Sequence, residues 1–424
     1  MSFEQPRTLL EQLIANGQYS YAELEEQFAR HARACGSDAT MSWRHLQRIA
    51  AGEVTRPRPA TARVLQRQFG LPMERLLGPA DVAASETVAG AAEMLPRSEV
   101  GELEPEGMAS IQNALASYPG LGVTTSPKVA MHDIERLAVE AHLRYQGADY
   151  SAATRMLPAL IQSTDALVAE SRGDIRRRSL ELQCSVYVVA AKLVTKVGNG
   201  ELAWLTADRA ANAALHAGSP TLGAAAAYQV ACAFLRNDRL DEAENIALVT
   251  AAHLGDNSPA GLSVRGALML LAAIIAGRRS DSGEATDRLH RAQRLADQLG
   301  KDANHGWTAF GPTNVAIHRV STALALGDAA SAVTEGEHVD VSALPPGLLS
   351  RRAQIHIDMA WAYTQRRGDA EAVLNLLEAE RVAPQILRYS IVVRRLLHEM
   401  VGRERRSATP GLRALARRAG ALES

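Results

Sequence analysis

Small residues recur in the C-terminal part of this chain at a spacing that few folds satisfy. In the stretch MAWAYTQRRGDAEAVLNLLEAERVAP, Ala360 and Ala372 lie twelve positions apart. Small side chains at this spacing allow two successive helices to pack closely as a hairpin. Leu376 and Ala379 continue the packing face of the second helix, and Pro384 ends the unit. The spacing therefore predicts a helical hairpin as the building unit of this region.

The same spacing recurs through residues 128–402. The other pairs are Ala141 with Ala153, Ala191 with Ala203, Ala231 with Ala243, Ala273 with Ala285, and Val320 with Ala332. Their second members follow one another at 40 to 50 residues, whereas the tetratricopeptide repeat has a period of about 34. We predict about six stacked tetratricopeptide-like hairpins with longer helices, closed by a capping helix and forming an α-superhelix with a concave surface.

The remaining segments complete an all-α fold, because apolar residues recur at helical spacing and runs of alternating β-branched residues are almost absent. Residues 1–79 contain several short helices that end at glycine, the pattern of a compact helix-turn-helix domain. Residues 80–127 are small, acidic and interrupted by proline and glycine, which predicts a linker with one or two transient helices. Residues 403–424 are a basic C-terminal tail.

Arginine is concentrated on one short segment of the first domain. Six arginines and a single acidic residue, Glu53, occur between positions 42 and 67. On a helix over SWRHLQRIAAG, Arg44, Gln47 and Arg48 share the side opposite the apolar residues. Arginine pairs bidentately with guanine, and glutamine with adenine. The exposed side therefore carries residue types that read base edges, although an ordinary solvated helix face has the same appearance.

The arginines that follow this helix have a different predicted role. They are Arg56, Arg58, Arg63 and Arg67. Contacts to phosphate position a protein on a duplex without specifying sequence, and they make binding sensitive to salt. We expect these arginines, Arg56 and Arg58 first among them, to hold the DNA backbone.

The stretch MSWRHLQRIAAGEVTRPRPATARVLQRQFGLPMERLLG resembles the Xre (lambda-repressor/Cro-like) helix-turn-helix family. Ser42 matches the small polar residue that opens the recognition helix, Gly52 the glycine after it, and Pro57 the proline of the next loop. The resemblance covers about 70 residues and implies a homodimer bound to a double-stranded operator. It implies DNA contacts from Ser42, Trp43, Arg44, Gln47 and Arg48. Trp43 has two interpretations, as a DNA contact or as the edge of the core.

An Xre-like head joined to such an array resembles a class of actinobacterial and Gram-positive regulators. In peptide-sensing members of this class the concave face binds a signal, which implies a small-molecule or peptide effector here. The stretch NHGWTAFGPTNVAIHRV holds candidate ligand-binding residues of aromatic, amide and imidazole type. They are Trp307, Phe310, Asn314 and His318. Helix capping and core packing are the alternative roles for these residues. Further candidates on first helices are Tyr228, Gln229 and Arg265.

Composition excludes several other classes of protein. The net charge of −1 argues against coating of nucleic acid or membrane along the whole chain, and the three cysteines form no metal-binding spacing. The N-terminus has charges where a signal peptide needs an apolar run, and ALMLLAAIIAG is too short to cross a bilayer. We therefore expect a cytoplasmic protein with no membrane partner. Catalytic motifs are absent, so we expect no enzyme and no cofactor.

Two functions remain open at the level of sequence. The first is a sequence-specific DNA-binding transcriptional regulator whose array senses a ligand or mediates dimerisation. The second is a protein-interaction scaffold with a helical head that does not touch DNA. Binding of duplex DNA distinguishes them.

Overall fold

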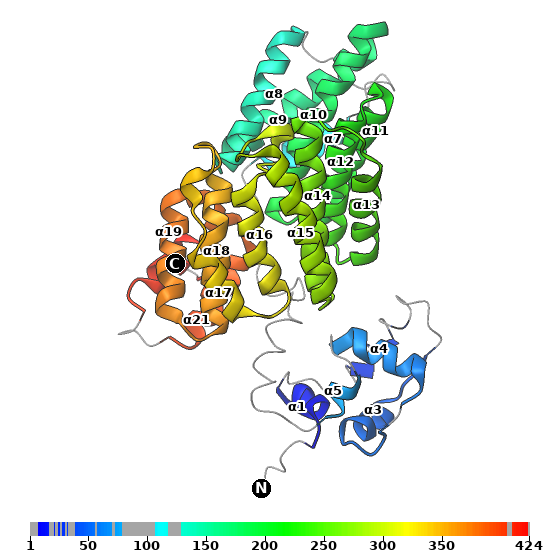
Figure 1. Cartoon of the computed structure of the whole chain (residues 1–424), viewed down its shortest axis with the longest axis vertical. Helices are drawn as coiled ribbons and strands as arrows, with labels where there is room; N and C mark the ends of the chain where they lie inside the picture. The colour runs from blue at the N-terminus through cyan, green and yellow to red at the C-terminus, as the bar shows by residue number, and fades with distance from the viewer. Residues whose placement is uncertain are drawn as a thin grey trace. The chain divides into compact units, whose positions relative to one another are not determined.

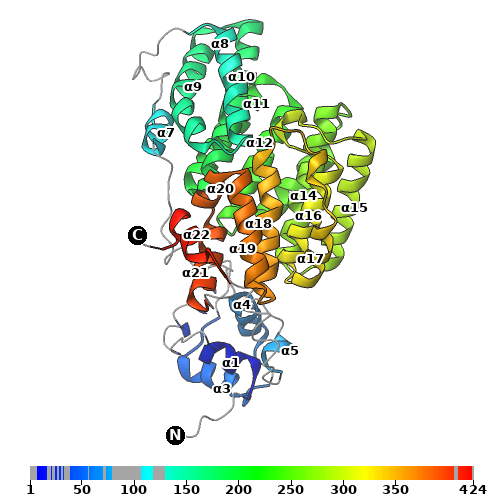
Figure 2. The same ribbon diagram turned by 90° about the vertical axis from the view of Figure 1, so that its left-hand side faces the viewer.

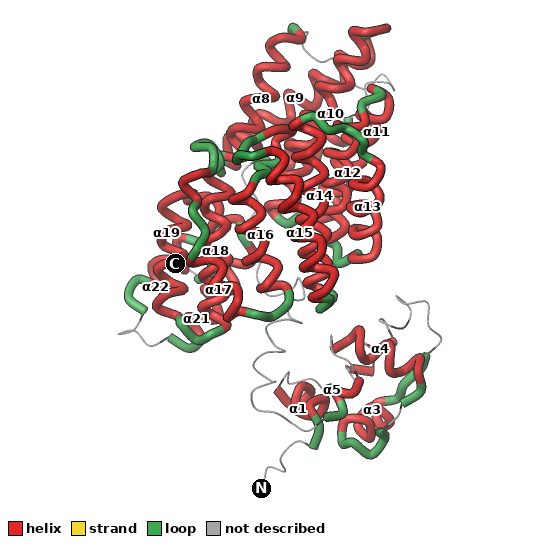
Figure 3. The backbone as a smooth tube through the Cα atoms, viewed as in Figure 1, coloured by secondary structure: helices red, strands yellow, loops and turns green. Residues whose placement is uncertain are grey.

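The structure is a computed structural model, and it is all-helical wherever it is described (Figure 3). It describes residues 7–16, 21, 24–25, 28–29, 32, 39–55, 57–69, 73–78, 107–117, 129–404 and 409–422. Every regular element in these residues is a helix, which confirms the all-α fold class. The chain divides into two compact units, Met1–Arg97 and Ser98–Ser424.

The first unit is a small bundle of short helices around an apolar core (Figure 1). Its described helices are α1 (Leu9–Asn16), α3 (Trp43–Ala50), α4 (Pro59–Phe69) and α5 (Met73–Leu76). Helix α1 packs against α3 and α5, and α4 packs against α5. The core includes Leu10, Phe28, Leu46, Ile49, Leu65 and Leu76. The Thr8 hydroxyl donates to the carbonyl of Ala50, which joins the start of α1 to the end of α3.

The second unit contains six consecutive pairs of antiparallel helices (Figure 1). The pairs are α8 (Met131–Gln146) with α9 (Tyr150–Glu170), α10 (Gly173–Val197) with α11 (Gly200–Ala217), α12 (Pro220–Arg236) with α13 (Leu240–His253), α14 (Pro259–Arg278) with α15 (Ser282–Leu299), α16 (Pro312–Ala325) with α17 (Ala329–Glu337), and α18 (Leu349–Gln365) with α19 (Asp369–Val382). Two short 3-10 helices, η2 (His305–Trp307) and η3 (Val341–Ala343), flank α16 and α17. The elements α20 (Pro384–Tyr389), α21 (Ile391–Gly402) and α22 (Leu412–Arg418) follow the last pair.

The predicted small-residue pairs mark these hairpins. All twelve residues of the six pairs are at most 1% exposed, and each pair has one member on each helix of its hairpin. The turns repeat as well, since a residue in the left-handed region comes seven positions after the first member of every pair. These turn residues are Ala148, Gly198, Asp238, Ser280, Gly327 and Arg367. The spacing in the sequence therefore reflects both the close helix contact and the turn that creates it.

The first helices of the six pairs form a closed ring. Helices α8, α10, α12, α14, α16 and α18 each contact the next one, and α18 also contacts α8. Hydrogen bonds join the two ends of the ring: the Tyr150 hydroxyl lies 3.1 Å from the Ser350 hydroxyl, and Gln385 accepts from the Ser151 N–H at 2.9 Å. The view in Figure 2 shows α18 and α20 near the first pairs. The first-helix faces that we expected to line a concave surface therefore face the interior of this ring.

Helix α14 is the most apolar element of the ring. By length and composition alone it could cross a membrane, but 83% of its most apolar window is buried inside the protein. This burial is the state of a core helix in a folded array. Close packing on one side is made possible by Gly266, which faces the ring of Phe310.

Both ends of the second unit differ from the predicted boundaries. Residues 107–117, assigned to the linker from sequence, include α7 (Met108–Leu115), which packs on α9 through Met108, Ile111 and Leu115. The tail predicted for residues 403–424 includes α22, whose Leu412 and Leu415 are fully buried. In both segments, apolar residues three or seven positions apart supply one buried helix face within a polar sequence.

Candidate nucleic-acid interface and candidate ligand site

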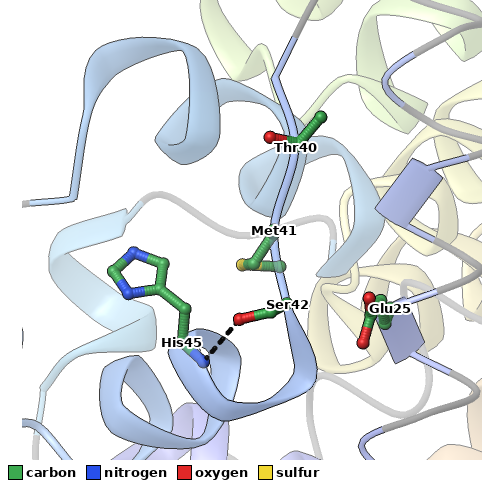
Figure 4. A pocket seen from close by; sticks show the side chains of 5 residues that line it. All are labelled: Glu25, Thr40, Met41, Ser42 and His45. Atoms are coloured by element: carbon green, nitrogen blue, oxygen red, sulfur yellow. Dashed lines mark hydrogen bonds between the residues drawn. The ribbon is translucent and has the colours of Figure 1, made fainter.

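Helix α3 presents the arginine face that the sequence predicts. Ser42 caps the helix by accepting a hydrogen bond from the backbone N–H of His45 at 3.4 Å (Figure 4). The apolar side of α3 is buried in the core. Arg44, Gln47 and Arg48 are exposed on the opposite side. The helix is therefore anchored by one face and offers three long polar side chains on the other.

Trp43 and Arg44 form a pair at the start of this helix. The Arg44 guanidinium lies 5.1 Å from the centre of the Trp43 ring, a cation–π distance. Trp43 remains 42% exposed. Since the indole is partly packed and partly open, neither interpretation of Trp43 is eliminated, and its ring limits the positions open to the Arg44 side chain.

Two carboxylates reduce the local positive charge more than the sequence indicated. Glu53 forms an exposed ion pair with Arg48, with Oε2 and Nε 3.2 Å apart. Glu25 accepts a hydrogen bond from the backbone N–H of Trp43 at 2.8 Å, so it occupies the N-terminus of α3. An open pocket beside it is lined by Glu25, Thr40, Met41, Ser42 and His45 (Figure 4). Sequence reasoning missed Glu25 because it lies 18 positions from its partner.

The other predicted DNA contacts are less fully described. Arg58 is exposed immediately before α4, and Arg63 is exposed on α4. Arg56 lies outside the described residues, as does the side chain of Arg67. Arg58 and Arg63 therefore add exposed positive charge to the first unit, next to the segment that bears Arg44.

The second site lies on the inner faces of the ring, within the second unit. We define the inner cationic cluster as Lys192 and Lys196 on α10 with Arg351 on α18. All three side chains are half-buried. Burial, and with it the charge of Arg351, lowers the pKa of both lysines, which places each lysine within electrostatic reach of Arg351. Sequence reasoning did not select any of them.

The strained segment before α16 contacts this cluster through a backbone carbonyl. The Trp307 carbonyl accepts from Lys192 Nζ at 2.7 Å and from Gln146 Nε2 at 3.3 Å. The Trp307 ring stacks on His142 with centroids 4.5 Å apart. Trp307 and Ala309 both have positive φ angles, of 59° and 53°. Side chains rarely adopt this region, so these contacts hold a backbone conformation that costs free energy.

Asn314 and His318 lie together on α16, as predicted, and both are buried. His318 Nδ1 donates to the Asn314 carbonyl at 2.8 Å. Burial, and then the charge of Arg351, lower the pKa of His318 to about 3, so the ring is neutral at physiological pH. Asn314 is 2% exposed, and its Oδ1 has no hydrogen-bond partner among the described residues. An unpartnered buried amide oxygen is an acceptor available to a bound molecule.

The other predicted ligand residues divide between the inner surface and the core. Tyr228 is half-buried near the cluster, and Arg351 and Cys232 both affect its pKa. Phe310 is fully buried against Gly266 and has no ring face free for a ligand. Gln229 is buried. Arg265 is committed to the preceding loop, where it donates to the Leu254 carbonyl and to Asn257 Oδ1.

One sequence signal could have identified the cluster. The chain has only four lysines, and two of them, Lys192 and Lys196, lie one helical turn apart in the apolar run SVYVVAAKLVTKV. A lysine is rarely placed on a helix that is buried on most sides. Two together in an arginine-rich chain indicate a polar feature inside the fold.

Burial of the two lysines makes the stability of the protein depend on pH. Their pKa values fall to about 8, chiefly because burial disfavours the charged ammonium. Between about pH 8 and pH 10 the unfolded chain then binds more protons than the folded protein, so stability rises with pH. We expect a contribution of up to about 1.4 kcal/mol per pH unit for each lysine.

The measurement is the pH profile of thermal unfolding for the wild type and for the double variant Lys192→Met, Lys196→Met. Subtracting the two profiles removes the opposing effect of buried thiols such as Cys184, whose pKa is raised to about 12. Parallel profiles from pH 7 to pH 10 would show that both lysines keep an ordinary pKa.

Comparison with known proteins adds no assignment to this geometry. No protein-family model matches the chain, and no curated protein is significantly similar to it. In the described part of the chain, histidine, cysteine and carboxylate side chains do not gather in groups of three or more that could hold a metal ion.

Proposed function

We propose that this protein is a cytoplasmic DNA-binding transcriptional regulator of the Xre helix-turn-helix type, with a tetratricopeptide-like sensor array. The observation that carries the proposal is the exposed row Arg44, Gln47 and Arg48 on a capped helix whose other face is buried. A helix anchored in this way offers side chains that match guanine and adenine in the major groove. The proposal includes no catalytic activity, no cofactor and no membrane partner.

The regulator acts as a homodimer on a double-stranded operator, because one domain of this size reads few base pairs and paired half-sites extend the contact. A small-molecule or peptide effector binds the array and shifts operator affinity. The shift is limited by the difference in effector affinity between the two states of the protein. Six hairpins with one repeated turn support a repeat array of this kind.

Selection from a random duplex library tests the DNA-binding half of this proposal. Full-length protein should enrich a single motif with two-fold symmetry, as expected for a dimer. Native mass spectrometry of protein purified from its own host reports the oligomeric state and any bound effector in one measurement. Recovery of unenriched DNA would instead favour the second candidate, a protein-interaction scaffold whose head does not contact DNA.

The ion pair between Arg48 and Glu53 leads to a specific expectation. Glu53→Gln removes an exposed carboxylate 3.2 Å from the Arg48 guanidinium. Exposed pairs contribute about 0.2–1 kcal/mol, so Arg48 loses little by leaving its partner, while a negative charge that repels DNA disappears. We expect affinity for any duplex to rise roughly two- to five-fold at low salt.

Fluorescence anisotropy at several salt concentrations measures this change. The matched control is Glu170→Gln, an exposed carboxylate at the end of α9 in the other unit. Equal affinities of the wild type and Glu53→Gln at every salt concentration would place Arg48 away from the DNA.

A further inference from the structure

The inner cationic cluster places three cations on the inner side of the ring in the second unit. Lys192 and Lys196 lie one helical turn apart on α10, and Lys196 donates to Gln354 Oε1 of α18 at 3.3 Å, three residues after Arg351. The charge of Arg351 acts on both lysines. Like charges in a poorly solvated interior repel strongly, since the effective dielectric constant there is well below that of water. Such a cluster is stabilised either by a compensating negative charge or by release of a proton from a lysine, and a bound anion favours the charged form of both lysines.

The described neighbours of the cluster supply only part of this charge. Asp358 raises the pKa of Lys196. Its carboxylate also accepts hydrogen bonds from Ser321 at 2.5 Å and from Gln354 at 2.8 Å. Cys232 remains a thiol, because burial raises its pKa to about 12. With His318 neutral as well, Lys192, Lys196 and Arg351 face one carboxylate among the described residues, a net charge of about +2 for these four groups. The charge of Arg236 also acts on Lys196 and adds to this positive excess.

The three cations also have N–H groups that donate to no described residue. Among the described residues, Lys192 donates to one acceptor, the Trp307 carbonyl, and Lys196 makes one long hydrogen bond of 3.3 Å to Gln354 Oε1. The Arg351 guanidinium forms no hydrogen bond or ion pair with any residue that the structure describes. Guanidinium groups are suited to bidentate contact with carboxylate or phosphate.

Two buried acceptors on other first helices of the ring, α8 and α16, are also unpartnered. Asn314 Oδ1 and His142 Nδ1 have no hydrogen-bond partner among the described residues. His142 is 1% exposed, and Lys192 lowers its pKa, which places it next to that lysine. On the same helix as Asn314, the pKa of His318 is lowered by burial and then by the charge of Arg351. A molecule that satisfies all these groups has an anionic part and an N–H or O–H donor.

We propose that the interior of the ring binds a small organic anion, whose carboxylate or phosphate lies between Lys192, Lys196 and Arg351. Asn314 and His142 accept from its donor groups. The closed ring, tied by contacts between α8 and α18, favours a compact ligand over a peptide laid across an open groove. This inference rests on the proposed function, because it names the chemical class of the effector that the array senses.

The test is thermal unfolding of the full-length protein with citrate or inorganic phosphate, against sodium chloride at equal ionic strength. Citrate combines carboxylates with a hydroxyl group that can donate a hydrogen bond. We expect at least one of the two anions to raise the melting temperature saturably by about 3 °C or more. Arg351→Met and Lys192→Met should each abolish that rise.

Matched controls separate binding from general effects of charge. Lys301→Met removes an exposed lysine, and Arg319→Met removes a half-buried arginine of α16 that contacts Gln293. Both should retain the full anion-dependent rise. Without added anion, Arg351→Met should melt close to the wild type, because its guanidinium has no hydrogen bond or ion pair to lose among the described residues, and the lost attraction to Asp358 is offset by less repulsion of Lys192 and Lys196. This second measurement shows that the variant is folded.

Three results would overturn the inference. They are a melting temperature no higher with either anion than with chloride, an equal anion-dependent rise in melting temperature in Arg351→Met, or loss of that rise in the control variants. None of these measurements involves DNA. A failure to bind anions would therefore leave the proposed DNA-binding function standing, and a failure to bind DNA would leave the anion site standing.

Discussion

Replacing Arg44 by alanine will weaken binding of the full-length protein to its selected duplex by roughly 5- to 100-fold, because a bidentate contact to guanine contributes about 1–3 kcal/mol of discrimination. The same change should affect a scrambled duplex much less, so the ratio of the two affinities falls. Arg44 is exposed on α3 and lies against Trp43, which orients it before DNA arrives. Anisotropy titrations with both duplexes measure the two affinities.

Arg58→Ala is the matched control for this prediction. Arg58 is exposed immediately before α4, and we expect it to contact phosphate rather than a base edge. Loss of the Arg58 side chain should weaken binding to both duplexes about equally. It should also reduce the slope of log affinity against log salt concentration by about one. If Arg44→Ala and Arg58→Ala gave the same pattern, Arg44 would be a backbone contact and base reading would need another residue.

Gly266→Ala should strongly destabilise the second unit. A Cβ atom at this position would lie 2.0 Å from Cζ of Phe310, and Phe310 is fully buried in the core between α14 and α16. A rigid ring cannot rotate away from such a clash, so neighbouring helices must shift. Overpacking of this kind costs about 1–3 kcal/mol, and we expect the upper end of that range.

Gly336→Ala is the comparison, since its Cβ would lie 2.0 Å from the Met359 sulfur. Methionine is flexible and adapts to its surroundings, so Gly336→Ala should lower the free energy of unfolding by less than about 1 kcal/mol. Chemical denaturation gives both values, and Phe310→Leu should restore part of the stability lost in Gly266→Ala. Equal stability of the two alanine variants would contradict this account of the α14 core.

Features that depend on local spacing were predictable from the sequence. The pairs such as Ala360 with Ala372 identified six hairpins, because close contact and a short turn both act over about twelve positions. The division of α3 into a buried face and an arginine face followed from the helical period alone. Both rest on interactions between residues close in the chain.

Features that depend on distant segments were not predictable. Closure of the ring joins Tyr150 to Ser350, 200 positions away, and no local pattern encodes that contact. Arg351 belongs to the same class, because its relation to the lysines of α10 exists only once the ring has formed. The contact between Glu25 and α3 crosses a shorter gap, but it too depends on how two helices meet.

The most direct test of the central claim is the affinity of the full-length protein for its selected duplex and for a scrambled one, measured from low to physiological salt. We expect the selected duplex to bind at least about 100-fold more tightly at physiological salt. The double variant Arg44→Ala, Arg48→Ala should lose this preference. Equal binding of both duplexes, unchanged in the double variant, would contradict the claim that α3 reads DNA sequence.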